Sequence, residues 1–438
     1  MISDLLVTLV LMAILIYGFS RPCIALCGIV YIDLYKPQGN SYSFLAGAPL
    51  SMVIAVFLFI TMLINVKKIT TPKNIVYHVL MLGFMAWITL TTINAQFPEL
   101  AWIKYDVAIK TIFLAYFIPF VLVDRKSVEL FVWFVGICLG TLMFWAGVKT
   151  LAGGGGYGVD LVGKGGMWSE GSTLANHGIT IIPLLVYLYK SSLLANSRQL
   201  FKYLLLGLIL CCFITLIGTQ ARSGIVCFVV LFAFYLKASK SKIKTMALAI
   251  IIPLMLLPMA PDSWFERMET MQGEDSIETE TSALGRIVVW RWTLDYVSER
   301  PFLGGGFYAY RANAGQLDRY RQGNEIAIDT PHPKAFHSII FEVLGGHGYV
   351  GLLLFLLIIL NTLLMNRKTT KRHGKLHWQG SLASSINIAL LIYCAGGLFV
   401  GIAFFPLIYY FYGLSIALYN LNEGKQDTLQ TPTFVKAQ

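Results

Sequence analysis

The sequence predicts an all-α integral membrane protein with about 12 transmembrane helices and one large extracytoplasmic loop that contains amphipathic helices. Of its 438 residues, 56% are hydrophobic and only 13% are charged, and the mean hydropathy is +0.67. A soluble protein of this length normally carries about twice that charged fraction. The apolar residues form many separate segments joined by short basic links. This pattern indicates a chain that crosses the bilayer repeatedly.

The candidate spans follow one another along the chain, since a hydrocarbon core of roughly 30 Å needs about 20 apolar residues per helix. They lie near residues 4–17, 22–34, 45–65, 75–94, 107–123, 128–148, 173–189, 203–218, 223–236, 245–259, 347–365 and 384–421. The last segment is long enough for two short helices broken near Pro406, so we expect about twelve or thirteen spans. The first segment lacks a basic flank and a small-residue cleavage site, so we expect it to remain as a membrane helix.

The basic residues indicate the topology. They cluster at Lys67–Lys73, Arg125–Lys126, Lys190–Lys202, Lys237–Lys244 and Arg367–Lys375, whereas the alternate links hold few. The positive-inside rule places the basic links in the cytoplasm. We therefore expect transmembrane helices 1–10 in residues 1–258, an outward loop at 259–346 that carries the catalytic helices, further transmembrane helices at 347–421 and a cytoplasmic tail at 422–438. The net charge of +11 is spread over juxtamembrane links, which favours contact with membrane lipids over nucleic acid.

The polar loop predicts two helices. Ser282 is expected to cap a helix that begins near Gly285 and runs to Arg300, where Pro301 and the glycines at 304–306 stop it. Ile287, Trp290, Leu294 and Val297 fall on one face at helical spacing, and such a tryptophan-rich helix suits a membrane interface.

The second expected helix starts after Asp329–Thr330 and ends at Gly345–Gly346. It would place His337, Phe341 and Leu344 on one face.

His337 is the leading candidate for chemistry, because histidine accepts protons near neutral pH. A histidine on a half-apolar helix is usually structural, but His332, Lys334 and several arginines share its loop. Arg222 interrupts two apolar segments on the same expected side of the membrane, where ionisable residues are costly and usually functional. Alternatively, the Arg222 side chain extends to the lipid headgroups and fixes the orientation of the helix in the membrane.

Arginines near the tryptophan-rich helix are candidates for phosphate binding, since a guanidinium binds phosphate through two hydrogen bonds. Arg286, Arg291 and Arg300 all belong to this group, although Arg291 and Arg300 can instead pair with nearby carboxylates. The sequence shows no paired aspartates and no His/Cys ligand set in the outward loops. We therefore expect no metal and no cofactor, with arginines stabilising the developing charge.

The cysteines and the glycine-rich stretch are both expected to be structural. The seven cysteines all lie in apolar segments and are expected to be buried hydrophobes. The glycine-rich stretch 151–171, which contains Trp168 and Glu170, lacks the spacing of a phosphate loop, and we interpret it as a linker.

Three segments together resemble the superfamily of bacterial O-antigen ligases and polymerases. They are Thr219-Gln-Ala-Arg-Ser-Gly, then Gly285-Arg-Ile-Val-Val-Trp with the block Pro301-Phe-Leu-Gly-Gly-Gly, and finally His337-Ser-Ile-Ile-Phe-Glu-Val-Leu-Gly-Gly-His-Gly. Their order, spacing and membrane context are more specific than any single segment, and they cover about residues 218–355. Ser338, Ala221 and Gly346 depart from the residues that are common in the family.

The resemblance implies a fold like that of C-type membrane glycosyltransferases, in the bacterial inner membrane, with the active site facing the periplasm. It implies metal-independent transfer of a glycan, with inversion, from undecaprenyl diphosphate to an acceptor. By position, Arg222 and Arg286 would bind the diphosphate and His337 would take the acceptor's proton. The remaining expected substrate-binding residues are Arg291, Arg300, His332, Lys334 and Trp290.

The favoured function is an O-antigen ligase, with an undecaprenyl-diphosphate-linked O-antigen donor and lipid A-core oligosaccharide as acceptor, in lipopolysaccharide biosynthesis. The alternatives are an O-antigen polymerase and a protein O-oligosaccharyltransferase that use the same donor. A lipid-glycan transporter is a further alternative, but the sequence shows no internal repeat of the kind that transporters usually have.

Overall fold

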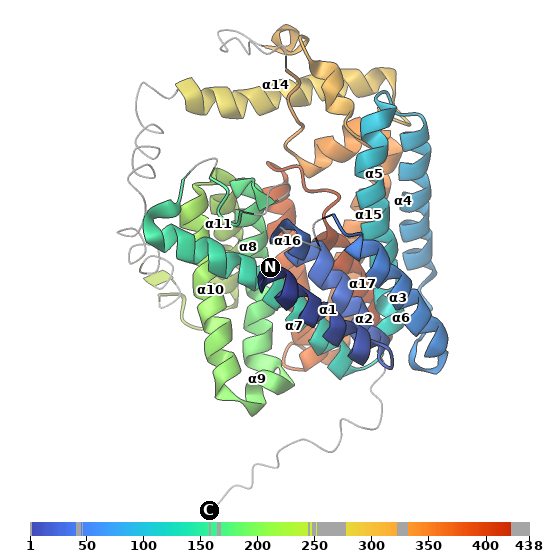
Figure 1. The fold of residues 1–438 in the computed structure, drawn as a ribbon. Helices are drawn as coiled ribbons and strands as arrows, with labels where there is room; N and C mark the ends of the chain where they lie inside the picture. Colours follow the sequence, from blue (N-terminus) through green and yellow to red (C-terminus); the bar gives the residue numbers. More distant parts are fainter. Residues whose placement is uncertain are drawn as a thin grey trace, which may run out of the picture.

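The computed structural model describes residues 2–40, 45, 47–156, 159–163, 168–243, 246–247, 251, 277–321 and 332–421, and in these ranges the chain is helical and forms no β-strand (Figure 1). The first half contains α1 (Ile2–Gly18), α2 (Pro22–Val30), α3 (Leu50–Ile64), α4 (Ile75–Ile93), α5 (Pro98–Tyr116), α6 (Ile118–Val121), α7 (Arg125–Lys149) and α8 (Gly171–Ser191). The second half contains α9 (Leu193–Ser197), α10 (Gln199–Thr219), α11 (Arg222–Ala238), α14 (Ile277–Glu299), α15 (Ile339–His373), α16 (Trp378–Gly397) and α17 (Pro406–Asn420).

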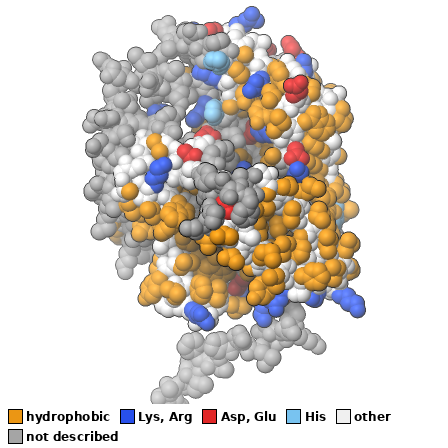
Figure 2. Space-filling model, viewed as in Figure 1, with side chains coloured by type: hydrophobic (Ala, Val, Ile, Leu, Met, Phe, Trp, Pro, Cys, Tyr) orange, Lys and Arg blue, Asp and Glu red, His pale blue; other side chains and the backbone are white. Residues whose placement is uncertain are grey.

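The bundle has the surface of a membrane protein. Among the described residues, 6 helices are long and apolar enough to cross a bilayer, namely α4, α7, α8, α10, α15 and α16. Large apolar side chains are exposed on the outer helices, such as Leu9, Leu63 and Leu200 at 66%, 75% and 73%. Figure 2 shows hydrophobic side chains over the middle of the face in view, with basic side chains along its lower edge. We therefore describe the chain as a multi-pass membrane protein, while the count of twelve spans stays a prediction.

Each expected span that the structure describes overlaps a helix, but α5 begins nine residues before the expected start at 107, and α15 extends eight residues beyond each end of the expected span 347–365. The segment 384–421 divides as expected, because α17 begins at Pro406. The expected span 245–259 lies almost entirely outside the described residues, as does the expected tail 422–438.

The centre of the bundle is α8, which packs against α7, α10, α11 and α16. Its polar residues Asn176, His177 and Thr180 are fully buried, and the Asn176 amide donates to the Tyr393 carbonyl at 3.2 Å. A polar group buried without a partner is costly, so such bonds tie neighbouring helices together. α8 is therefore a buried element that is bonded to its neighbours as well as packed against them.

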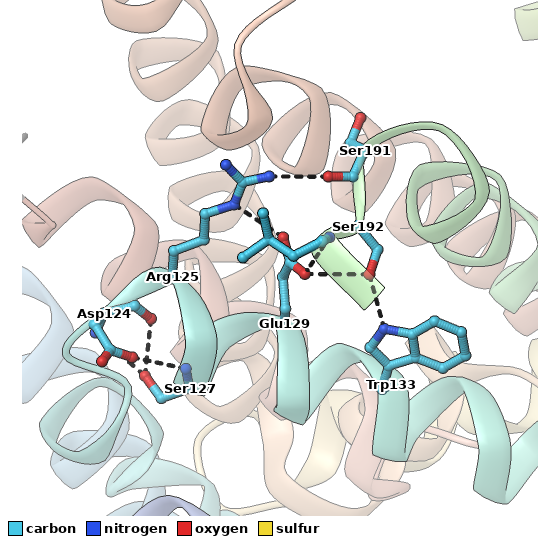
Figure 3. A network of polar contacts seen from close by, with 8 residues as sticks. Asp124, Arg125, Ser127, Glu129, Trp133, Ser191 and Ser192 are labelled. Atoms are coloured by element: carbon cyan, nitrogen blue, oxygen red, sulfur yellow. Dashed lines mark hydrogen bonds and ion pairs between the residues drawn. The ribbon is translucent and has the colours of Figure 1, made fainter. Parts of the chain in front are cut away.

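At the end of the bundle away from α14, a carboxylate network joins three helices (Figure 3). Glu129 of α7 pairs with the Arg125 guanidinium at 2.9 Å and accepts from the Ser192 hydroxyl at 3.1 Å and the Leu193 amide at 2.9 Å. The Ser192 hydroxyl also accepts from the Trp133 indole at 2.9 Å. The network satisfies the buried carboxylate and fixes the turn between α8 and α9 on α7.

At the opposite end, α14 lies across the top of the bundle (Figure 1). It was expected to begin near Gly285 with Ser282 as its cap, but it begins at Ile277, so Ser282 lies inside the helix. The acidic residues that precede Ser282 are good helix formers, and the helix extends into them. Its end at Glu299, just before Pro301, is as expected.

The buried face of α14 also differs from the expected one. Val288, Val289 and Trp292 are buried against Ala309, Leu317 and Phe336, whereas Leu294 is 49% exposed. Apolar residues lie on both sides of this helix, so spacing alone does not identify the packed face, and the following loop decides it.

Two glycine-rich segments contact each other through their backbones, where α15 was expected to end. The amides of Gly305 and Gly306 donate to the carbonyls of Gly345 and Gly346 at 3.0 and 2.7 Å. A Cβ atom at Gly348 would lie 2.1 Å from the Phe302 carbonyl, and its φ of +66° kinks α15 without ending it. The glycines therefore permit close approach of two chain segments.

Candidate active site

A cavity of about 770 Å³ lies where α14 covers the starts of α8 and α11. It is lined by residues 169–172, 219, 221–223, 226, 285–287, 289, 290, 333–335, 337 and 399. Near the top of the face in Figure 2, basic, acidic and histidine side chains lie beside a hollow. The three motifs that lie far apart in the sequence therefore contribute to a single cavity.

α14 supplies one wall of the cavity through Arg286 and Trp290, which lie one helical turn apart. The indole of Trp290 stacks on Phe341 with ring centroids 5.0 Å apart, and its N–H donates to the Phe336 carbonyl at 2.9 Å. Trp290 therefore forms a wall and also holds the backbone next to His337.

Three of the expected substrate-binding residues lie away from this cavity. The Arg291 guanidinium donates to the Tyr320 carbonyl at 3.2 Å, on another face of α14. Arg300 follows the end of α14 and lies over the Tyr296 ring, 5.6 Å from its centroid. His332 is exposed at the edge of the described segment and does not line the cavity. None of these three residues lines the cavity, and their part in substrate binding stays a prediction.

His337 lines the cavity, but it is not on a helix, and here the expectation was wrong. Residues 332–337 have no helical structure, Ser338 caps α15, and His337 has a φ of +46°. A positive φ is uncommon for a residue other than glycine and is often found at functional sites. Pro333 explains part of the difference, because the residue before a proline disfavours the helical region.

The backbone of this segment is held by a buried asparagine from the preceding loop. The Asn313 amide nitrogen donates to the Lys334 carbonyl at 2.8 Å, and its side-chain oxygen accepts from the Lys334 amide at 3.0 Å. Asn313 is fully buried. We call this pair of bonds the Asn313 clasp. Together with the Trp290 bond to Phe336, it fixes the extended segment and so prevents the helix from starting before His337.

The charges around His337 act in both directions. Burial lowers the pKa of His337, the Glu170 carboxylate raises it, and the Arg286 charge lowers it. Among the weaker effects, Glu342 raises this pKa and Lys334 lowers it. The Glu170 carboxylate oxygen Oε1 lies 4.0 Å from His337 Nδ1. A lowered pKa keeps the imidazole neutral near pH 7, which is the form that accepts a proton. Burial also lowers the pKa of Lys334, against the effect of Asp318.

The opposite wall is made by the first residues of α8 and α11, which both begin at the cavity. Arg222 is the first residue of α11, and Thr219, Ala221 and Ser223 line the cavity beside it. Helix N-termini carry partial positive charge and favour anions. With Arg222, Arg286 and Lys334 on its walls, the cavity suits a phosphate or diphosphate group.

A charged pair outside the cavity lining fixes the first turn of α15. The Lys104 ammonium lies 2.6 Å from Glu342 Oε1, and Glu342 Oε2 accepts from the Ala403 amide at 3.0 Å. Glu342 is 8% exposed. The pair therefore ties α5 and the loop before α17 to the helix that follows His337.

Sequence reasoning missed Glu170, the Asn313 clasp and the Lys104–Glu342 pair. The glycine-rich stretch was interpreted as a linker, yet Ser169, Glu170 and Gly171 line the cavity. The available signal was a carboxylate just before a polar helix start, Gly171-Ser-Thr. Asn313 carries no such signal, because an asparagine in a loop is common in any protein.

Comparison with known families gives two matches, each to one segment of the chain. Residues 207–356 match the model of a family described as O-Antigen ligase. This part of the chain belongs to the O-antigen ligase superfamily. Residues 2–193 match the model of a family of unknown function. No curated protein gives a significant match.

The O-antigen ligase match runs from α10 to the middle of α15 and includes Arg222, Arg286 and His337. Glu170 and the start of α8 belong to the other matched segment. The cavity therefore takes its walls from both segments. At a coarse level, this match supports a membrane enzyme of the O-antigen ligase and polymerase type, a family whose substrates are in general polysaccharides and lipids.

Proposed function

We propose that this protein is an O-antigen ligase that transfers a glycan from undecaprenyl diphosphate to lipid A-core oligosaccharide. The observation that carries the proposal is the convergence of Arg222, Arg286, Lys334 and His337 on one cavity of about 770 Å³. Three cationic side chains and a histidine suit a reaction in which a diphosphate leaves and a hydroxyl loses its proton.

In the proposed reaction, the acceptor hydroxyl oxygen attacks the anomeric carbon of the donor sugar. The bond from that carbon to the diphosphate oxygen breaks, and the lipid diphosphate leaves with the electron pair. His337 takes the hydroxyl proton as the new bond forms. Arg222 and Arg286 bind the diphosphate, where a guanidinium stabilises the growing negative charge through paired hydrogen bonds.

The position of the cavity supports a site on the periplasmic face of the inner membrane. The links that contain Arg125 and Lys190 to Lys202 meet at the end of the bundle away from α14 (Figure 1). Basic links favour the cytoplasm, so the cavity under α14 falls on the other side. A site at the membrane surface suits a donor and an acceptor that are both lipid-anchored.

The test is transfer by the purified protein from an undecaprenyl-diphosphate-linked glycan, with lipid A-core oligosaccharide, a second donor molecule or a serine-containing peptide as acceptor. We expect product with lipid A-core, in the absence and presence of a chelator. Product only with the second donor would replace the ligase by a polymerase, and product only with the peptide would replace it by a protein O-oligosaccharyltransferase. Donor movement across the bilayer without transfer would overturn the enzyme proposal.

A further inference from the structure

We propose that Glu170 is the carboxylate partner of His337, which orients the imidazole and stabilises the imidazolium that forms when the ring takes the acceptor's proton. This inference rests on the proposed function and adds a residue to it. Glu170 lies outside the segment that matches the O-antigen ligase family, in the segment that matches the family of unknown function. It would give that first half of the chain a direct part in the site.

The two oxygens of Glu170 face different partners. Oε1 lies 4.0 Å from His337 Nδ1, and Oε2 accepts from the Thr173 hydroxyl at 3.2 Å. The second contact orients the carboxylate so that its other oxygen faces the ring. A base that is itself oriented by a third group is the arrangement that recurs in histidine-dependent acyl-transfer enzymes.

The carboxylate is carried at the start of α8, a helix that is mostly buried. Glu170 is the residue that precedes α8, and its carbonyl accepts from the Leu174 amide at 3.1 Å. Thr173 is 1% exposed, and its carbonyl bonds to the buried His177 ring at 2.8 Å. Groups held on packed helices place a partner more accurately than groups on free loops. The Glu170 side chain is therefore supported by packing as well as by its own hydrogen bond.

The side chains of Glu170 and His337 are 46% and 42% exposed, so water reaches both. Water screens their attraction while the cavity is empty, but a bound glycan lipid and acceptor would exclude it. Charges interact much more strongly when water is excluded. The pair would therefore act mainly in the substrate-bound protein.

The proton has one consistent path. Since Nδ1 faces Glu170, Nε2 is the nitrogen that takes the proton from the acceptor hydroxyl, and Nδ1 keeps its hydrogen toward the carboxylate. The ring becomes an imidazolium beside a carboxylate, and the electron pair of the broken bond leaves on the lipid diphosphate. The imidazolium then loses its proton to water, so the base is restored.

The test compares Glu170→Gln with the wild-type protein in a transfer assay across the pH range, under the conditions of the proposed function. Gln keeps the size of the side chain and can still accept from Thr173, but it lacks the charge. We expect kcat to fall by on the order of 10-fold to 100-fold, which is at most the lower end of the roughly 10²- to 10⁴-fold that a general base contributes, because His337 itself remains. A wild-type kcat at every pH would overturn the proposal.

The pH profile separates this role from a structural one. The groups that act on His337 are Glu170 before α8, Arg286 on α14, Lys334 in its own segment and Glu342 on α15. Glu170 favours the charged ring and raises the pKa of His337, so its loss lowers that pKa. Activity requires the neutral ring, so the acidic limb of kcat/KM should move to lower pH in Glu170→Gln. An unmoved limb would contradict the proposal.

Two further variants serve as controls. Glu170→Asp keeps the charge, so its acidic limb should stay close to that of the wild-type protein even where kcat falls. If Glu170→Gln fails to fold, the comparison uses Glu170→Asp and Glu170→Ser. The acidic limb of the kcat/KM profile should then lie at lower pH in Glu170→Ser than in Glu170→Asp. Glu299 is exposed and lies outside the cavity, so Glu299→Gln should leave both kcat and the acidic limb of the kcat/KM profile at their wild-type values.

A direct titration separates failure of this inference from failure of the proposed function. The pKa of His337 can be measured by NMR of histidine-labelled protein, with His337→Ala to assign its signal. A lower pKa in Glu170→Gln supports the pair even if no glycan is transferred. Normal transfer together with an unchanged His337 pKa would remove Glu170 from the mechanism and leave the ligase proposal intact.

Discussion

Substitution of Asn313 by alanine removes the clasp that holds the segment before His337. Asn313 is fully buried, and its two bonds of 2.8 and 3.0 Å satisfy both backbone groups of Lys334. A backbone group left unpaired in the interior costs about 1–3 kcal/mol. Lys334 is half-buried, so water partly replaces the lost partners and we take ~1–3 kcal/mol for the two bonds together.

This free energy bounds the effect on catalysis. A change of 1.36 kcal/mol is about tenfold in an equilibrium or a rate, so ~3 kcal/mol lowers the fraction of molecules with His337 in place by at most about 160-fold. The Trp290 bond to Phe336 remains and limits the movement. We expect kcat to fall by on the order of 10-fold. Donor affinity should fall less than kcat, because Arg222 and Arg286 stay in place and only Lys334 loses its backbone support.

The assay is steady-state transfer with separate determination of kcat and of donor Kd. Asn94→Ala is the matched control, since Asn94 caps α4 with an exposed bond to Leu90 and lies outside the cavity. Folding of both variants is checked by thermal unfolding in detergent. A folded Asn313→Ala protein with kcat within twofold of wild type would refute the idea that the clasp positions His337.

Three further predictions concern charges near the cavity and at the other end of the bundle. Arg286→Ala should weaken donor binding and move the acidic limb of the kcat/KM profile to higher pH, because the Arg286 charge lowers the pKa of His337. Arg286→Lys keeps the charge and should return the limb to its wild-type pH. A limb that moves to lower pH in Arg286→Ala would contradict this account. Lys104→Met should leave the Glu342 carboxylate without its cationic partner and lower the free energy of unfolding by ~1–3 kcal/mol. This is less than for a fully buried pair, because the Lys104 side chain is 30% exposed. Thermal unfolding checks this, and an unchanged midpoint would show that the pair contributes little. Glu129→Gln should weaken the network of Figure 3 and lower the unfolding temperature. The kcat of the folded protein should stay at the wild-type value, because the network lies at the end of the bundle away from the cavity. A reduced kcat would show that the two ends are coupled.

The membrane helices could be predicted from the sequence because each depends on a local property, a run of apolar residues of sufficient length. The same holds for the end of α14 at Glu299, which Pro301 and the following glycines determine. The gathering of Arg222, Arg286 and His337 could be expected from their shared side of the membrane and from the family resemblance. Their common cavity in the structure agrees with that expectation.

The misjudged features depend on contacts between segments distant in the sequence. His337 lies outside a helix because Asn313 and Trp290 hold the preceding backbone, and neither bond can be read from local spacing. α15 continues past Gly345, where the glycine carbonyls accept from the amides of Gly305 and Gly306 and the kink at Gly348 lets that segment approach. Likewise Glu170 lies near His337 only because the start of α8 and the segment before α15 meet at the cavity, so the glycine-rich stretch resembled a linker in the sequence.

The most direct test of the central claim is the transfer rate of His337→Ala at saturating donor and acceptor, measured beside the affinity for the lipid-linked donor. The claim is that His337 is the base of a cavity in which cationic side chains hold the diphosphate. It predicts a fall in kcat of about 10²- to 10⁴-fold with donor Kd near the wild-type value. A folded His337→Ala protein that transfers glycan within a few-fold of the wild-type rate would contradict it.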